Sequence, residues 1–221
     1  MLRPNSPFFD KISHAGFEIM KKSESIVLGF VLGAVPPIVG FLAFWWSSIP
    51  FLPERLIFVS AVLGLMAGLI IDIVYLKKWV AQAYDYDLKI WMGLYGFYSV
   101  CIFGFFMGVP VFNVVLAVPA GFFIGCKLAH LQADGEEYRR LAGRTCIFTT
   151  LVLALVCLTA AVIAISDPYT GADLQGMFHL GFEVTPAMIG WIVALGGTIL
   201  LGLQWWITSK MIRLAYRWTR V

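Results

Sequence analysis

Six long apolar stretches, separated by short polar connections, dominate the pattern of this chain. They cover residues 25–46, 56–76, 90–109, 111–130, 146–165 and 187–208. A helix that crosses a hydrocarbon core of ~30 Å needs about 20 apolar residues at a rise of 1.5 Å per residue. Each stretch meets that length, so the pattern predicts an all-α membrane protein with six transmembrane helices.

The composition agrees with a membrane protein and argues against a soluble domain. The 221 residues are 60% hydrophobic and only 13% charged, whereas a soluble domain carries roughly 25% charged residues. No segment outside the six stretches is long enough to hold a core of its own. We therefore expect one membrane domain over residues 25–209, flanked by an amphipathic cytoplasmic segment over 1–24 and a basic cytoplasmic tail over 210–221.

The charge of the connections alternates along the chain. Lys and Arg gather before the first stretch, after the second and fourth, and after the sixth, whereas the connection at 166–186 has acidic residues and no basic one. Basic connections of membrane proteins stay in the cytoplasm. The alternation predicts three out-and-back hairpins in the cell membrane, with both termini cytoplasmic.

Both ends of the chain have an amphipathic helical pattern. Near the N-terminus, Phe8, Ile12 and Ile19 fall on one helical face, which is typical of a helix that lies on the membrane surface. At the C-terminus a basic stripe repeats at helical spacing, and its members are Lys210, Arg213, Arg217 and Arg220. Each basic side chain near anionic lipid contributes ~1 kcal/mol of binding. We expect this stripe to bind anionic lipids at the cytosolic face, with an acidic protein partner as the alternative.

Small residues and prolines recur within the apolar stretches. Glycines four apart share a helical face and let two backbones approach closely. Such pairs are Gly29-xxx-Gly33, Gly64-xxx-Gly68, Gly104-xxx-Gly108 and Gly121-xxx-Gly125. They predict tight packing within the bundle, or an interface to another membrane subunit or a second copy of the chain. Pro36-Pro37 and Pro119 predict kinks in the first and fourth helices.

Few polar groups interrupt the apolar stretches, and those present fall at comparable depth toward the cytosol. The candidates for a substrate-binding site are Asp72, Lys127, Gln204 and Tyr95. A charge near the centre of a membrane costs on the order of 2.5 kcal/mol or more, so such groups are functional candidates. If the second and fourth helices touch, Asp72 and Lys127 could pair beside a cytosol-facing cavity for a small charged solute. A structural pair, or two side chains that reach the inner surface, is the alternative.

The remaining polar features have plain structural interpretations. Asn113 is a lone polar group near the outer end of the fourth stretch. Asp134 is expected to cap a short surface helix, with Glu137 at the third helical position. We interpret the connection at 166–186 as a solvated loop. The cysteines lie in or at the ends of apolar stretches and are expected to be packing residues, and they are Cys101, Cys126, Cys146 and Cys157.

The chain lacks the short motifs that would name a reaction. It has no HExxH, no GxSxG, no phosphate-binding GxxxxGK[ST] and no CxxC. Its histidines lie in three separate regions without metal-ligand spacing. We therefore expect no cofactor and no metal. The net charge of +3 is explained by membrane orientation and lipid contact, so no nucleic-acid partner is expected.

Three functions from different classes remain open at this point. A transport-related protein handling a small solute would use the polar groups and the kinked helices. A non-catalytic subunit of a larger membrane complex would use the glycine faces and the basic tail. An enzyme acting on a lipid or lipid-linked substrate at the cytosolic face is the third, and the missing catalytic constellation argues against it.

Overall fold

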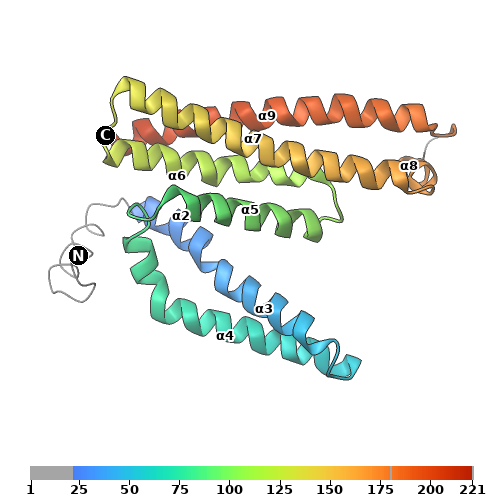
Figure 1. The fold of residues 1–221 in the computed structure, drawn as a ribbon, viewed down its shortest axis with the longest axis horizontal. Coiled ribbons are helices and arrows are strands. Elements are labelled where there is room, and N and C mark those ends of the chain that lie inside the picture. Colours follow the sequence, from blue (N-terminus) through green and yellow to red (C-terminus); the bar gives the residue numbers. More distant parts are fainter. Residues whose placement is uncertain (1–21, 180, 221) are drawn as a thin grey trace. The chain divides into compact units, whose positions relative to one another are not determined.

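The computed structural model describes residues 22–179 and 181–220, and every regular element in that part of the chain is a helix (Figure 1). Six helical stretches are long and apolar enough to cross a membrane, namely Lys22–Ser48, Glu54–Ala81, Leu88–Phe105, Pro110–His130, Gly135–Ser166 and Pro186–Arg220. The prediction of six apolar helices is confirmed. Their out-and-back orientation and the cytoplasmic position of the termini stay predictions. Most of the expected N-terminal segment, 1–24, lies outside the described residues.

The chain divides into two compact units, residues 1–86 and 87–221. Unit 1 holds α2 (Lys22–Gly33), α3 (Val35–Ser48) and α4 (Glu54–Ala81). Unit 2 holds α5 (Leu88–Phe105), the 3-10 helix η1 (Pro110–Leu116), α6 (Ala117–His130), α7 (Gly135–Ser166), α8 (Thr170–Phe178) and α9 (Pro186–Arg220).

In unit 1 the first apolar stretch is interrupted as the prolines predict. Helix α2 ends at Gly33 and α3 begins at Val35, with Pro36 and Pro37 in its first turn. Proline has no amide hydrogen to bond to the preceding turn, so it is tolerated where a helix starts and interrupts one elsewhere. The interruption at Pro36-Pro37 is therefore confirmed.

Helices α3 and α4 approach each other through glycines. A Cβ atom added to Gly40 would collide with the carbonyl oxygen of Gly64, and one added to Gly64 would collide with that of Gly40. One turn further along α4, a Cβ atom on Gly68 would collide with the backbone of Pro36 and Pro37. The predicted pair Gly64-xxx-Gly68 thus lies in a close helix contact, and Gly40 supplies the opposite side of it.

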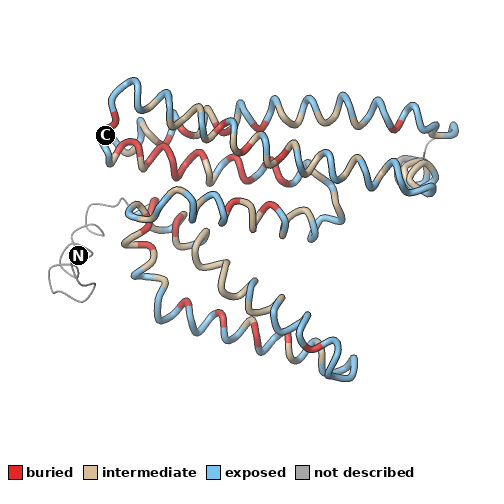
Figure 2. Tube along the Cα trace, in the orientation of Figure 1, coloured by how far each residue is buried: buried red, intermediate tan, exposed pale blue. Residues whose placement is uncertain are grey.

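In unit 2 the closest contact joins α6 to α9. A Cβ atom added to Gly121 would lie 2.7 Å from the Met211 Cβ, and one added to Gly125 would lie 2.6 Å from the Ala215 Cβ. The predicted pair Gly121-xxx-Gly125 is therefore also a packing surface. The span formed by η1 and α6 is the most deeply covered of the six spanning candidates (Figure 2).

In the other two predicted pairs, at most one glycine faces another helix among the described residues, since a Cβ atom added to Gly33 would lie 3.2 Å from the Leu76 side chain of α4. A Cβ atom added to Gly29 or Gly104 would meet nothing within 4 Å. Gly108 instead has a φ of 81° in the turn after α5, a conformation that glycine adopts without steric cost. Pro119 lies in the first turn of α6, where the chain passes from 3-10 to α-helix, so it starts a helix rather than kinking one.

Local signals in the connections account for the helix starts. The Asp134 carboxylate accepts hydrogen bonds from the amides of Glu136 and Glu137 at 3.0 and 2.7 Å, which confirms it as a helix cap. The expected short surface helix is wrong, because the helix that begins there is α7 and continues without a break to Ser166. Asp87 caps α5 in the same way through the Lys89 amide. The connection at 166–186, expected as a loop, contains the short helix α8. The basic C-terminal residues are helical, but they continue α9 without a break to Arg220.

Candidate functional site

A chain of buried polar side chains crosses the interior of unit 2, and we call it the polar ladder. Its members are Asn113 on η1, Ser99 and Tyr95 on α5, Gln204 and Thr208 on α9, and Thr149 on α7. Tyr95 is 9% exposed and each of the others 2% or less. Buried polar groups in a lipid-exposed bundle are costly unless they find partners, so the arrangement of these partners decides what the ladder can do.

The first rung joins Asn113 to Ser99. The Asn113 Nδ2 donates hydrogen bonds to the Ser99 carbonyl oxygen at 2.9 Å and to the Ser99 Oγ at 2.8 Å. Asn113 lies in η1, where the chain returns after the turn that follows α5, so the rung ties the returning segment back onto α5. The lone polar group of the fourth stretch therefore has a definite partner.

The second rung joins Tyr95 to Gln204, two of the residues proposed from sequence. The Gln204 Nε2 donates a hydrogen bond of 2.9 Å to the Tyr95 phenol oxygen. Tyr95 lies one helical turn before Ser99 on the same face of α5, so the first two rungs are stacked. The ring of Phe148 from α7 packs edge-on against Tyr95, with 5.6 Å between ring centroids.

The third rung joins Thr208 to Thr149. Their hydroxyl oxygens are 3.4 Å apart, and the Thr149 hydroxyl also donates to the Cys146 carbonyl oxygen at 3.2 Å. Thr208 follows Gln204 by one turn of α9, so the ladder passes from η1 through α5 and α9 to α7. Each step between rungs is one helical turn, about 5–6 Å.

Two oxygens of the ladder lack a hydrogen-bond partner among the described residues. They are the Asn113 Oδ1 and the Gln204 Oε1, and each belongs to an amide whose nitrogen is already bonded within the ladder. Because the Tyr95 phenol accepts from Gln204, its own hydrogen is still available for donation. The ladder therefore offers two amide acceptors and one phenol donor, all uncharged, which is the chemistry of recognition for a small polar molecule.

The sequence pointed to part of this arrangement. The structure brings Tyr95 and Gln204 together, whereas Asp72 belongs to unit 1 and Lys127 to unit 2, so their pairing stays a prediction. Ser99, Thr149 and Thr208 were missed. A spacing of four residues from another ladder residue could have found two of them, since Ser99 follows Tyr95 and Thr208 follows Gln204 at that spacing. Thr149 has no such neighbour in the sequence.

Unit 1 has its own buried acids. Asp72 is 8% exposed, its Oδ1 has no hydrogen-bond partner among the described residues, and Gly33 of α2 lies beside it. Glu24 is fully buried and accepts a hydrogen bond of 3.0 Å from the Tyr84 hydroxyl. Sequence reasoning missed Glu24 because it precedes the first apolar stretch, where a carboxylate is expected to be solvated.

Most basic residues of unit 2 lie at the end of α6, the start of α7 and the C-terminal part of α9, which are neighbours in the fold (Figure 1). Lys127 lies in the last turn of α6, with its ammonium 5.9 Å from the centre of the Phe123 ring. On α9, Lys210 lies over the Trp206 ring at 5.9 Å and Arg220 over the Tyr216 ring at 4.8 Å. Within the described part of the chain, no group of three or more His, Cys, Asp or Glu residues is arranged to hold a metal ion.

Comparison with known proteins adds no family to this picture. No protein-family model matches the chain, and no curated protein or solved structure matches it either. The class rests on the chain itself, since six helices of sufficient length and apolar character support a multi-pass membrane protein.

Proposed function

We propose that this multi-pass protein is a transport-related component, and that unit 2 binds a small uncharged polar solute at the polar ladder. The observation that carries the proposal is the pair of partnerless amide oxygens, the Asn113 Oδ1 and the Gln204 Oε1. They belong to neighbouring rungs attached to one face of α5. A buried acceptor without a donor costs ~1–3 kcal/mol, and a ligand that donates hydrogen bonds would recover that cost.

The charge of the solute follows from the side chains of the ladder. None of its six members is ionised, and a charged solute placed among them would lose its hydration without gaining a counter-ion. The expectation of a charged solute, which rested on Asp72 and Lys127, therefore gives way to an uncharged donor such as an alcohol or an amide. Both amide oxygens are covered in this conformation. A solute can reach them only after the side chains of neighbouring rungs move apart, so we take this conformation as the closed one.

The test is solute flux through proteoliposomes, followed by light scattering with glycerol and urea as the probes. Wild-type protein should speed the flux of at least one of them over empty liposomes. Gln204→Leu and Asn113→Leu should each slow it about 10-fold, which corresponds to the loss of one hydrogen bond to the solute. Flux no faster than in empty liposomes, or variants as fast as wild type, would refute the proposal.

A matched control lies on the same helix as Gln204. Thr198 is exposed on α9, and its hydroxyl bonds only to the Ala194 carbonyl oxygen of its own helix, at 2.7 Å. Thr198→Val also exchanges a polar side chain for an apolar one without touching the ladder. This variant should conduct like wild type.

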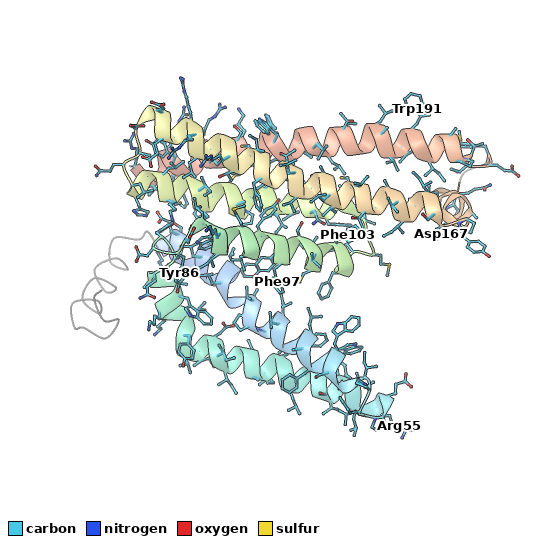
Figure 3. The ribbon with its side chains drawn as sticks, viewed as in Figure 1. Arg55, Tyr86, Phe97, Phe103, Asp167 and Trp191 are labelled. Carbon is cyan, nitrogen blue, oxygen red and sulfur yellow. The ribbon has the colours of Figure 1, made fainter. Side chains whose placement is uncertain are left out.

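The alternative function, a subunit of a larger membrane assembly, is favoured by the outer half of α9. Gly190, Ala194, Thr198 and Gly202 recur every four residues there and are all exposed. Trp191 beside them projects away from the helix and is 67% exposed (Figure 3). Disulfide cross-linking through Ala194→Cys in native membranes would reveal such a partner, and a stable monomer in mild detergent would count against it.

A further inference from the structure

Helices α7 and α9 define where the hydrocarbon core ends in unit 2. The first basic residue next to the apolar part of each helix is Arg144 on α7 and Lys210 on α9. The contact between Thr149 and Thr208 lies a few residues to the apolar side of both. Counted from these basic residues to the far helix ends, the uncharged parts hold 22 residues in α7 (145–166) and 24 in α9 (186–209). These lengths, ~33–36 Å, match one hydrocarbon core. On the other side both helices carry a charge nearly every turn, so that part cannot lie in lipid.

Helix α6 packs largely against the charged side of this boundary. A Cβ atom on Gly125 would lie 2.5 Å from the Ile212 oxygen and 3.0 Å from the Tyr216 nitrogen. Further along, the Thr219 hydroxyl donates to the Cys126 sulfur at 3.3 Å, and the Tyr216 hydroxyl to the Ala133 carbonyl oxygen at 3.4 Å. The second half of α6 is therefore level with residues 212–220 of α9, beyond Lys210.

This position explains why α6 is so well covered. The large apolar side chains from the middle of α6 onward are covered, since Phe122, Phe123, Ile124 and Leu128 are each 7% exposed or less. Lipid-facing helices leave such side chains exposed, as the other spans of this chain do. An apolar helix that protrudes beyond the lipid must instead be covered by protein. Here the start of α7 and the end of α9 cover it, and the three form a small bundle that we call the basic end.

The surface of the basic end is strongly positive. Three acids, Asp134, Glu136 and Glu137, are outnumbered by its basic residues, which are Arg139, Arg140, Arg144, Lys210, Arg213, Arg217 and Arg220. Arg213 and Arg217 are one turn apart on α9, and both are exposed. The rings of Tyr138 and Tyr216 are in contact, with 4.9 Å between centroids, which places the Tyr138 ring against α9 at the residue that precedes Arg217.

We propose that the basic end stands outside the hydrocarbon core and binds the phosphate of anionic phospholipid headgroups through Arg213, Arg217 and the Tyr138 hydroxyl. Guanidinium groups match phosphate oxygens with paired hydrogen bonds, and a phenol adds a further donor. The inference is independent of any solute at the polar ladder.

The depth of these residues favours lipid over an acidic protein. Arg213 follows the boundary residue Lys210 by one turn, or ~5 Å, which is the headgroup layer. Helical side chains lean toward the helix N-terminus, so those of Arg213 and Arg217 lean back toward the bilayer. Trp205 and Trp206 are exposed at the same boundary, as is typical of helices anchored at a lipid interface.

The test is native mass spectrometry of the full chain in detergent, titrated with short-chain phosphatidylglycerol and, separately, phosphatidylcholine. Wild-type protein should prefer phosphatidylglycerol. Arg213→Gln with Arg217→Gln should weaken that binding about 30-fold, since each charge near the surface contributes roughly 5-fold. The matched control is Lys77→Gln with Lys78→Gln, which removes the same charge from exposed positions in unit 1 and should leave the affinity within about 3-fold of wild type.

Three outcomes would overturn the proposal. One is equal affinity for the two lipids, and another is equal loss from both double variants. The third is displacement of phosphatidylglycerol by an acidic peptide, such as polyglutamate, at a lower concentration than by the lipid itself, which would assign the surface to an acidic protein. A second measurement tests the depth. Leu214→Cys, at a position 61% exposed beside Arg213, should react with a water-soluble maleimide, and its protection would place the basic end in lipid.

Discussion

Gln204 and Tyr95 lie 109 positions apart in the chain, yet the Gln204 amide donates a 2.9 Å hydrogen bond to the Tyr95 phenol in the interior of unit 2. The contact joins α9 to α5, two helices whose other buried polar groups continue the ladder in both directions. Because both side chains are largely removed from water and lipid, each depends on the other for its partner. This interdependence can be measured.

The first prediction concerns this hydrogen bond. Tyr95→Phe and Gln204→Leu should each lower the free energy of unfolding in detergent, and the double variant should lose less than the sum. A double-mutant cycle isolates the pair, and hydrogen bonds between membrane helices give coupling of about 0.6–1.7 kcal/mol. Strict additivity of the two losses would show that the bond is absent in the folded protein.

The second prediction concerns the contact of α6 with α9. Gly125→Ala should destabilise unit 2 by ~1–3 kcal/mol, because the new Cβ would lie 2.5 Å from the Ile212 backbone oxygen and the helices would have to separate. Thermal unfolding in detergent measures the change.

Gly143→Ala is the control for that substitution. Gly143 is also inside a helix, α7, but a Cβ atom there would meet nothing within 4 Å. Alanine favours a helix over glycine by ~1 kcal/mol, so this variant should be neutral or more stable. Equal losses from the two variants would mean that the helix contact is not the cause.

The third prediction concerns the turn between α5 and η1. In the direction of the turn, α5 continues for about 10 residues beyond Tyr95. The apolar part of α9 continues in the same direction for about 17 residues beyond Gln204, so it reaches further. We therefore expect the turn to stop roughly 10 Å short of the membrane surface that the far end of α9 reaches, within lipid. Its amides suit that position, since Phe106, Met107, Gly108 and Val109 all donate backbone hydrogen bonds to preceding carbonyls.

Met107, 94% exposed at the tip of this turn, provides the test. Met107→Cys, in a variant whose own cysteines are replaced, should resist water-soluble maleimide from either side of the membrane. A lipid-soluble maleimide should label it. Rapid labelling by the water-soluble reagent would place the turn at the outer surface and make α5 and α6 ordinary full spans.

The fourth prediction concerns Asp72. Its Oδ1 is buried without a hydrogen-bond partner among the described residues, and an uncompensated carboxylate costs more to bury than an amide of the same shape. Asp72→Asn should therefore leave the stability unchanged or raise it by about 1 kcal/mol in a thermal unfolding assay. A loss of several kcal/mol would instead reveal a cationic partner, for which Lys127 is the candidate predicted from sequence.

Much of the local structure could be predicted because its causes are local. Pro36 and Pro37 interrupt the first apolar helix wherever the rest of the chain lies, and Asp134 caps α7 through amides two and three residues away. The glycine pairs were harder to predict. Gly121 and Gly125 pack against α9, whereas Gly29 and Gly104 face no neighbour. A pair of small residues permits two helices to approach closely, but it does not determine which helix packs against it.

The candidate site was predicted only in part, for a similar reason. Tyr95 and Gln204 stood out as polar residues in apolar helices, but serine and threonine bond so readily to their own helix that Ser99, Thr149 and Thr208 carried no comparable signal. The basic tail was expected as a cytoplasmic segment of its own after residue 209. Nothing in its own sequence says that α9 continues through it and that α6 packs alongside.

The sequence by itself determined the number of apolar helices, because the cost of exposing backbone and charge to hydrocarbon acts on each segment separately. It also determined the helix starts and the interruption at the prolines, which depend on neighbours within a few residues. Only the tertiary structure decided which polar side chains meet, which glycines form contacts, and that the second half of α6 is covered by protein. Those outcomes depend on the relative depth of the helices, which is set by side-chain packing between residues far apart in the chain.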